Sequence, residues 1–533
     1  MDQGVLVGSP WSSCFRTVPA GHPAGHQSID TFPCLSYGKH IEVYERPGNV
    51  DKGQDMSHRD HQPQQRIYRG GDSVAELSVT RRDVLKAAAF AAGSVSLGSG
   101  VRIATAQEKG DRPVRDEGVT VLNPCGRVPV SLIIDDSTCL VNMAHFGIPQ
   151  FAEVFPDNYK QDWKKLPREI PDSFVRKFGQ WCHEHGVKGK YSIVPYPACV
   201  GWLDSHLPGW SKKELTESIK LVRELMMPDW DIHPEMISHT FVIDTKTGRP
   251  YPERTERFME NWGWTTGRSA DEIADYMSYA LRILKNIGLE CEGITTPGGF
   301  GNQALPELSQ ATLQSCRDVF KTEIPHYFRH LFTDGQSVAP RVEYASGLDS
   351  EDPKCVVSII GCTGDWFGGW DGLERGSVDK FITEDLRGGR LPQVIEKGEP
   401  AILVCHWPGI YFNGDEVGFN ILKEVVRRLD ARYDSLLWMK QREIARYWAA
   451  KELTRVKKEG NRIAVNAPFA APRFTLRVNA APSQPPTVVS SGVATKLEQV
   501  QKPLWLKSGT WCQDATGMTI CFDLPKGQST IQL

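Results

Sequence analysis

The chain has 533 residues, of which 40% are hydrophobic and 24% are charged, and its 62 Lys and Arg against 65 Asp and Glu give a net charge of −3. This length predicts a few domains, and the composition excludes a wholly disordered or collagen-like chain. The near-neutral charge supplies no basic field for a phosphate backbone, so we exclude nucleic acid as a partner.

The pattern of the first 106 residues predicts a targeting segment rather than a folded domain. Residues 1–70 show no apolar period, which predicts a disordered or mis-annotated extension, with translation starting at Met56. Arg81 and Arg82 then precede a short apolar run at 87–97, which resembles a twin-arginine export signal. The run is too short for a stable membrane span, so we expect export to the periplasm or the medium, with a membrane anchor as the less favoured alternative.

Cysteine spacing gives little support to a disulfide scaffold or a thiolate zinc site. The chain has 13 cysteines, and no two of them have the two intervening residues of the CxxC pattern. An odd number of them follows residue 106, so pairing is incomplete, and Cys512 with Cys521 is the pair we expect.

Between residues 128 and 448, short apolar runs alternate with amphipathic helices. Capping boxes at Ser211 with Glu214, and at Ser269 with Glu272, predict two helix starts. The expected strands are 130–134, 188–194, 230–233, 291–295, 356–360, 401–406 and 435–439. Continuous apolar strands that alternate with helices predict a parallel α/β barrel, closed or nearly closed.

The C-terminal region changes to alternating apolar and polar residues broken by Pro, Ser and Gly, which predicts a small β-sandwich. A packing role is favoured over a carbohydrate-binding one. The predicted organisation is an extension at 1–70, a signal region at 71–106, a linker at 107–127, a barrel at 128–450 and a β-sandwich at 459–533.

Polar residues follow the predicted strands at the edge where barrel enzymes place their chemistry. These stations are Asp135 with Asp136, His233, Thr296 to Gly299, Asp365 with Trp366, and His406.

The order of these stations resembles the NodB-type polysaccharide deacetylases (carbohydrate esterase family 4). The similar segments are 134–138, 185–194, 231–240 and 403–406, and the resemblance extends over about 128–448. It implies a divalent metal, Zn²⁺ first, with Co²⁺, Ni²⁺ or Mn²⁺ as alternatives.

The resemblance also implies residue roles. Asp136, His233 and His239 would be the metal ligands, Asp135 the base that takes a proton from the attacking water, and His406 the acid that protonates the leaving group. Each has a structural alternative: the aspartates cap a helix or form a turn, one of His233 and His239 is a structural histidine, and His406 is a core histidine.

Two departures from the family pattern affect these roles. His233 and His239 are six residues apart, whereas the family's histidines are four apart, so they cannot share a helix face. Thr295 stands where the family has an arginine beside the base. His183 and His185 are better explained as a solvated helix end than as metal ligands.

Aromatic and polar residues near the predicted mouth suit a carbohydrate, because flat rings stack on sugars. The alternative is that these aromatic rings only cover the barrel loops. The candidate substrate-binding residues are Thr296, Pro297, Gly298, Asp365, Trp366, Trp407 and Tyr411.

The sequence therefore favours a metal-dependent hydrolase that removes acyl groups from an extracytoplasmic glycan. A glycoside hydrolase that pairs Asp135 with Asp365 or Glu292 is the first alternative. A glycan-binding protein that has lost catalysis along with the arginine is the second.

Overall fold

The computed structural model describes residues 112–113, 116–481 and 484–533. The predicted extension at 1–70 and the signal region at 71–106 lie outside these described residues. Within them, no helix combines the length and the apolar character needed to cross a membrane.

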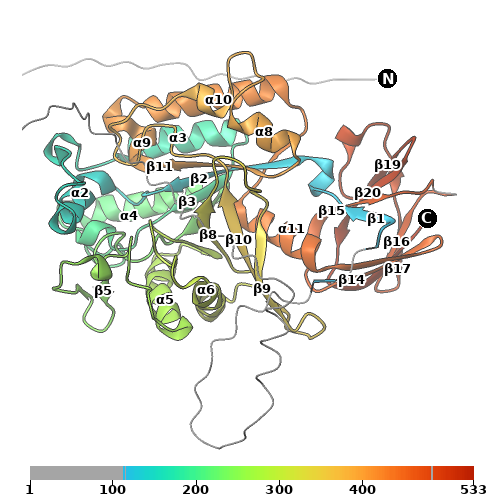
Figure 1. The fold of residues 1–533 in the computed structure, drawn as a ribbon, viewed down its shortest axis with the longest axis horizontal. Coiled ribbons are helices and arrows are strands. Elements are labelled where there is room, and N and C mark those ends of the chain that lie inside the picture. Colours follow the sequence, from blue (N-terminus) through green and yellow to red (C-terminus); the bar gives the residue numbers. More distant parts are fainter. Residues whose placement is uncertain (1–111, 114–115, 482–483) are drawn as a thin grey trace, which may run out of the picture. The chain divides into compact units, whose positions relative to one another are not determined.

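The first sheet of the larger domain is parallel throughout (Figure 1). The central strand β2 lies between β11 and β3, its first residues also pair with β12, and β4 continues from β3. The strands are β2 (Val128–Asp135), β3 (Gly189–Ser192), β4 (Trp230–His233), β11 (Ala401–His406) and β12 (Leu436–Trp438). These strands confirm five of the predicted runs, because burial of a parallel strand on both faces selects continuous apolar sequence.

The second sheet has the order β7-β8-β10-β9, in which only β9 is antiparallel to its neighbour. Its strands are β7 (Gly293–Thr295), β8 (His326–Leu331), β9 (Arg341–Ser346) and β10 (Lys354–Gly361). Backbone hydrogen bonds link the two sheets at both seams, from Thr295 N–H to Pro234 O (3.1 Å) and from Cys362 N–H to Ile402 O (2.7 Å). Among the described residues, the predicted barrel is thus one parallel and one mixed sheet that meet at both edges without one continuous ladder.

Amphipathic helices connect and cover these strands. The two predicted capping boxes are present at the starts of α4 and α5, with both reciprocal hydrogen bonds. Helices α3 and α10 pack against each other through Phe178 and Phe419, whose ring centroids are 5.3 Å apart. The helices are α2 (Met143–Val154), α3 (Asp172–Glu184), α4 (Lys212–Leu221), α5 (Ala270–Asn286), α6 (Leu305–Phe320), α7 (Val378–Phe381), α8 (Arg390–Glu396), α9 (Trp407–Tyr411), α10 (Val417–Arg432) and α11 (Gln441–Leu453).

The C-terminal strands form the predicted β-sandwich, as two five-stranded sheets. One sheet also contains β1 (Val119–Val121), which pairs with β15 antiparallel, so part of the region predicted as a linker belongs to the sandwich. The other strands are β13 (Arg455–Glu459), β14 (Arg462–Ala467), β15 (Ala471–Val478), β16 (Thr487–Ser490), β17 (Val493–Lys496), β18 (Glu498–Gln499), β19 (Thr510–Asp514), β20 (Gly517–Leu524) and β21 (Gly527–Gln532).

Helix α11 joins the two domains through a shared apolar core. Ile444 of α11 lies in one buried cluster with Ile359 of β10 and Phe474 of β15. Burial of this kind contributes about 25 cal/mol per Å² of apolar surface. The sandwich and the barrel therefore share one apolar core.

The predicted pairing of Cys512 with Cys521 is not supported by the strand register. In the antiparallel pair of β19 and β20, Cys512 faces Thr519 and Cys521 faces Thr510. The two cysteines are therefore diagonal neighbours, roughly 7–8 Å apart. A disulfide usually spans less than about 6.8 Å between Cα atoms, so this pair does not fit one.

Candidate metal centre

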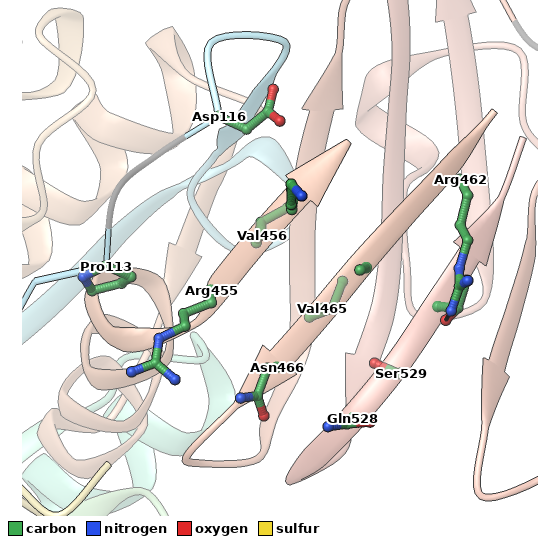
Figure 2. Close-up of a pocket in the computed structure, with 12 residues that line it drawn as sticks. Pro113, Asp116, Arg455, Val456, Arg462, Val465, Asn466, Gln528 and Ser529 are labelled. Carbon is green, nitrogen blue, oxygen red and sulfur yellow. Dashed lines mark hydrogen bonds between the residues drawn. The ribbon is translucent and has the colours of Figure 1, made fainter. Parts of the chain in front are cut away.

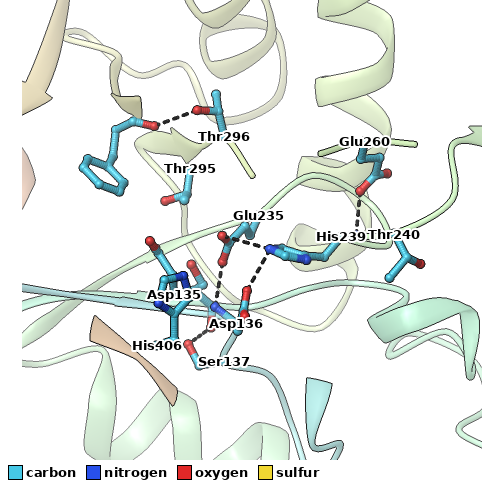
Figure 3. A network of polar contacts seen from close by, with 12 residues as sticks. Asp135, Asp136, Ser137, Glu235, His239, Thr240, Glu260, Thr295, Thr296 and His406 are labelled. Atoms are coloured by element: carbon cyan, nitrogen blue, oxygen red, sulfur yellow. Dashed lines mark hydrogen bonds and ion pairs between the residues drawn. The ribbon is translucent and has the colours of Figure 1, made fainter. Parts of the chain in front are cut away.

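Asp135, Asp136 and His406 meet at the carboxyl edge of the first sheet (Figure 3). Asp135 ends β2 and His406 ends β11, and the parallel register places these two residues directly opposite each other. Asp136 follows with a left-handed backbone (φ 56°), a conformation that aspartate tolerates better than most residues. The chain thus leaves the direction of β2 at Asp136, directly after Asp135.

A buried cluster of two carboxylates and one imidazole lies beside this strand end. His239 Nε2 is 2.7 Å from Asp136 Oδ1 and 3.3 Å from Glu235 Oε1. The backbone N–H of Asp136 donates a 2.9 Å hydrogen bond to Glu235 Oε2. One ligand atom from each of the three residues lies within 4.8 Å of the others, which is a separation that a single cation can bridge.

The donor set fits a divalent metal ion. Asp136 Oδ1 is buried and its close polar contact is His239 Nε2, so a cation bound at this point would take the place of the proton on His239. Burial lowers the pKa of His239, but the charges of Asp136 and Glu235 outweigh it and raise that pKa well above its usual value. Carboxylates that stabilise a proton so strongly at this point would also stabilise a cation, and Asp, Glu and His are ordinary ligands of Zn²⁺ and Mn²⁺.

The loop that carries His239 is held by a buried carboxylate, Glu260. Its oxygens accept the backbone N–H groups of Ile237, Ser238 and His239, and also the hydroxyl of Tyr276. His239 itself has a positive φ of 62°, so its backbone needs this external support. Glu260 therefore fixes the direction of the imidazole.

The predicted ligand His233 does not lie in this cluster with Asp136 and His239, but in a second buried group with Asp231 and His326. His233 lies inside the barrel, where its Nε2 is 2.9 Å from His326 Nε2 and its Nδ1 is 3.3 Å from Thr295 Oγ1. Asp231 lies close to this histidine pair but accepts a 2.6 Å hydrogen bond from the backbone N–H of Arg442. His233 and Glu235 are two residues apart and so point to the same side, but only Glu235, beyond the end of β4, reaches Asp136.

A buried lysine stands beside the candidate base. Lys190 of β3 has no solvent exposure, and its ammonium donates to Asp135 Oδ1, to Ser192 Oγ (2.8 Å) and to Ile134 O (3.1 Å). Burial raises the pKa of Asp135 to about 6, against the opposing effect of the Lys190 charge. Lys190 of the neighbouring strand β3 thus places beside Asp135 a positive charge that Thr295 cannot provide.

His406 has its own carboxylate partner. Its Nδ1 lies 2.9 Å from Asp365 Oδ2, and its side chain is 25% exposed. Burial lowers the pKa of His406, but Asp365, Asp136 and Asp135 together outweigh burial and raise it to about 10. The raised pKa favours the imidazolium form of His406, which is the form that a general acid needs before it donates a proton.

Two of the predicted substrate-binding residues have other positions in the structure. Trp407 has no exposed surface and packs against Phe178 and Tyr191, with centroids 5.0 and 5.4 Å away. Its ring is part of the core and cannot stack on a sugar in this structure. Asp365 is the partner of His406, as described above.

Of the other predicted substrate contacts, Thr296 and Gly298 each have a structural role. Thr296 Oγ1 donates to Phe328 O (3.0 Å), so its hydroxyl is already used. Gly298 follows Pro297 with a φ of +44°, and a Cβ there would lie 2.7 Å from Asn261 O, which gives it a packing reason. The partly exposed Trp366 and Tyr411 remain predicted substrate contacts.

A cavity of about 690 Å³ lies in the sandwich, away from these residues (Figure 2). Its walls come from β13, β14 and β21 and from the segment around Pro113 and Asp116. No aromatic ring is among the described residues that line it, so it offers no stacking surface for a sugar.

Comparison with known proteins gives only distant likenesses. No family model and no curated protein match the sequence. Solved structures with similarity include a probable polysaccharide deacetylase from Pseudomonas aeruginosa PAO1 and the Puue allantoinase, each 12% identical with a TM-score of 0.32. The alignments cover 60% and 61% of this chain and 91% of each of those chains. Such low values support no conclusion about the candidate site, which is inferred from its geometry alone.

Proposed function

We propose that this protein is a metal-dependent hydrolase that removes acyl groups, acetyl first, from an amide or ester on an extracytoplasmic carbohydrate. The observation that carries the proposal is the cluster of Asp136, Glu235 and His239 at the sheet edge, flanked by the candidate base Asp135 and the candidate acid His406. The proposed ion is Zn²⁺, with Mn²⁺ as the main competitor, because the second carboxylate makes the site harder than one with two imidazoles.

The cation would bind to Asp136, Glu235 and His239, and when bound it would acidify a water molecule and polarise the acyl carbonyl. Asp135 would then accept the proton of the attacking water. Its carboxylate stays at this position because the buried ammonium of Lys190 holds it. Lys190 would thereby take over the role that the family gives to an arginine.

His406 would protonate the departing amine or alkoxide. Asp365 holds the Nδ1 side of the ring, which leaves Nε2 as the nitrogen that can donate a proton toward the substrate. Base and acid come from adjacent strands and end in register, so they can act on the two sides of one bond.

The glycoside hydrolase alternative has less support. Glu292 precedes β7 at the amino end of the strands and pairs with Arg442 (3.1 Å), whereas Asp135 lies at the carboxyl end of β2. The other partner, Asp365, is hydrogen-bonded to His406. Neither of the two candidate partners is therefore a free carboxylate placed opposite Asp135.

The test combines metal content with acetate release from acetylated chito-oligosaccharides and acetylated xylan fragments. We expect about one bound ion per chain and metal-dependent acetate release. Glu235→Gln should lose both, whereas His233→Gln should keep the ion, provided that circular dichroism shows both variants folded. Release of reducing sugar without bound metal would instead support the glycoside hydrolase, and neither activity would support a binding protein.

A further inference from the structure

Two buried cysteines far apart in sequence face each other at the junction of the barrel and the sandwich. Cys125 lies just before β2, and Cys521 lies in β20, 396 residues later. Their sulfur atoms are 3.8 Å apart, and both side chains are buried in one small cluster that also contains Leu506 and Cys512. Cys512 is the diagonal neighbour that the strand register excludes as the partner of Cys521.

The backbone around Cys125 holds its thiol in this direction. Cys125 has a left-handed φ of 55°, which costs free energy for a residue with a side chain. Its N–H donates to Thr475 Oγ1 (2.9 Å), and Leu122 N–H donates to Thr475 O (2.9 Å). Since β15 pairs with β20, the same contacts that fix Cys125 also fix its distance from Cys521.

We propose that Cys125 and Cys521 form a disulfide bond that ties the chain entering the barrel to the sandwich. The sulfurs need to approach by less than 2 Å to reach the bond length of about 2.05 Å, which rotation of the two side chains can supply. The bond does not involve the metal cluster, so it is independent of the proposed activity.

The chemistry is a two-electron oxidation by a disulfide of a thiol–disulfide oxidoreductase or of glutathione. Cys125, as thiolate, attacks one sulfur of the oxidant and releases the other as a thiol. Cys521 then gives up its proton and attacks the Cys125 sulfur, which releases the second thiol of the oxidant. Two protein thiols are oxidised and one disulfide of the oxidant is reduced.

The electrostatic surroundings favour Cys125 as the first nucleophile. The contact with the Cys521 thiol and the charges of Arg473 and Arg127 lower the pKa of Cys125, against the effect of its burial. The same contact and burial raise the pKa of Cys521 well above its usual value. A thiolate rather than a thiol is the reactive form, so the order of attack is set.

The test is to produce the full chain in a bacterial host with an oxidising cytosol, so that it folds in the presence of thiol–disulfide oxidoreductases. Free thiols are blocked in denaturant, and the digest is analysed by mass spectrometry without reduction. We expect a cross-linked peptide pair containing Cys125 and Cys521, 2 Da lighter than the two free peptides together. Protein from a host with a reducing cytosol should lack it.

The variants separate this pair from its neighbour. Cys512→Ser should keep the cross-link, whereas Cys125→Ser and Cys521→Ser should lose it. The oxidised wild type should also show a higher Tm than the reduced protein, by about 5 °C, because the cross-link restrains the unfolded chain. A wild-type digest with no link between Cys125 and Cys521, or with Cys521 linked to Cys512, would overturn the proposal.

Discussion

Replacing Lys190 by methionine would test whether the buried ammonium supports the candidate base. Lys190 has no exposed surface, and the Asp135 side chain is 7% exposed, so neither charge can turn to water for compensation. Removal of one partner of a buried ion pair costs about 3–5 kcal/mol, because it leaves the other charge without compensation. Methionine keeps most of the volume of the lysine stem, so the loss reflects charge rather than a cavity.

The assay is urea unfolding at fixed pH, combined with the rate of acetate release. We expect Lys190→Met to lose about 3–5 kcal/mol of unfolding free energy and at least about 100-fold in kcat, which is the usual loss when a general base fails. The matched control is Lys188→Met, since Lys188 is 35% exposed and its Nζ lies 4.0 Å from Asp229. That change should cost less than about 1 kcal/mol and leave kcat unaltered. Equal stability and equal kcat in the two variants would refute the role of Lys190.

Three further changes test other parts of the site. Asp365→Asn removes a carboxylate that keeps the pKa of His406 near 10. The alkaline limb of kcat/KM, where His406 loses its proton, should therefore move to lower pH. An unmoved limb would contradict the role of His406 as acid. Glu260→Gln weakens the support of the His239 loop and should lower metal affinity about 10-fold or more in a chelator competition, whereas unchanged affinity would show that the loop supports itself. Ser269→Ala removes the N-cap of α5 and should cost about 1 kcal/mol in urea unfolding without changing kcat; a change in kcat would mean that α5 acts on the site.

The strands and helix starts could be predicted because their signals are local. A parallel strand buried on both faces selects an unbroken apolar run, as in β2 and β11, and a capping box specifies a helix start within four residues, as at Ser211 and Ser269. Strand β8 was missed because two histidines and an arginine interrupt its apolar residues. The barrel interior is polar at that point, which a search for apolar runs cannot detect.

The sequence predicts two members of the candidate cluster, Asp136 and His239, but not the third, Glu235. Glu235 stands four residues before His239, which is the separation the family uses for its two histidines. Glu235 is not predicted because the family has an imidazole at that position of the pair, and a carboxylate does not match it. Asp136 and His239 are in the predicted cluster, and Asp135 and His406 are beside it.

Lys190 and Glu260 could not be found from sequence because their partners are distant in the chain. Lys190 is one of many lysines, and only the pairing of β2 with β3 brings it to Asp135, 55 residues earlier. Glu260 acts on backbone N–H groups 21 to 23 residues away, which carry no signal in the side chains. Such contacts follow from topology and need coordinates.

The central claim is that Asp136, Glu235 and His239 bind one cation, and anomalous diffraction from crystals of the metal-loaded protein tests it most directly. Data collected on both sides of the absorption edge of the bound metal identify the element and its position. We predict one peak that lies within about 2.0–2.2 Å of three atoms: a carboxylate oxygen of Asp136, a carboxylate oxygen of Glu235, and Nε2 of His239. A peak beside His233 and His326 instead, or none at the cluster in protein that still releases acetate, would contradict it.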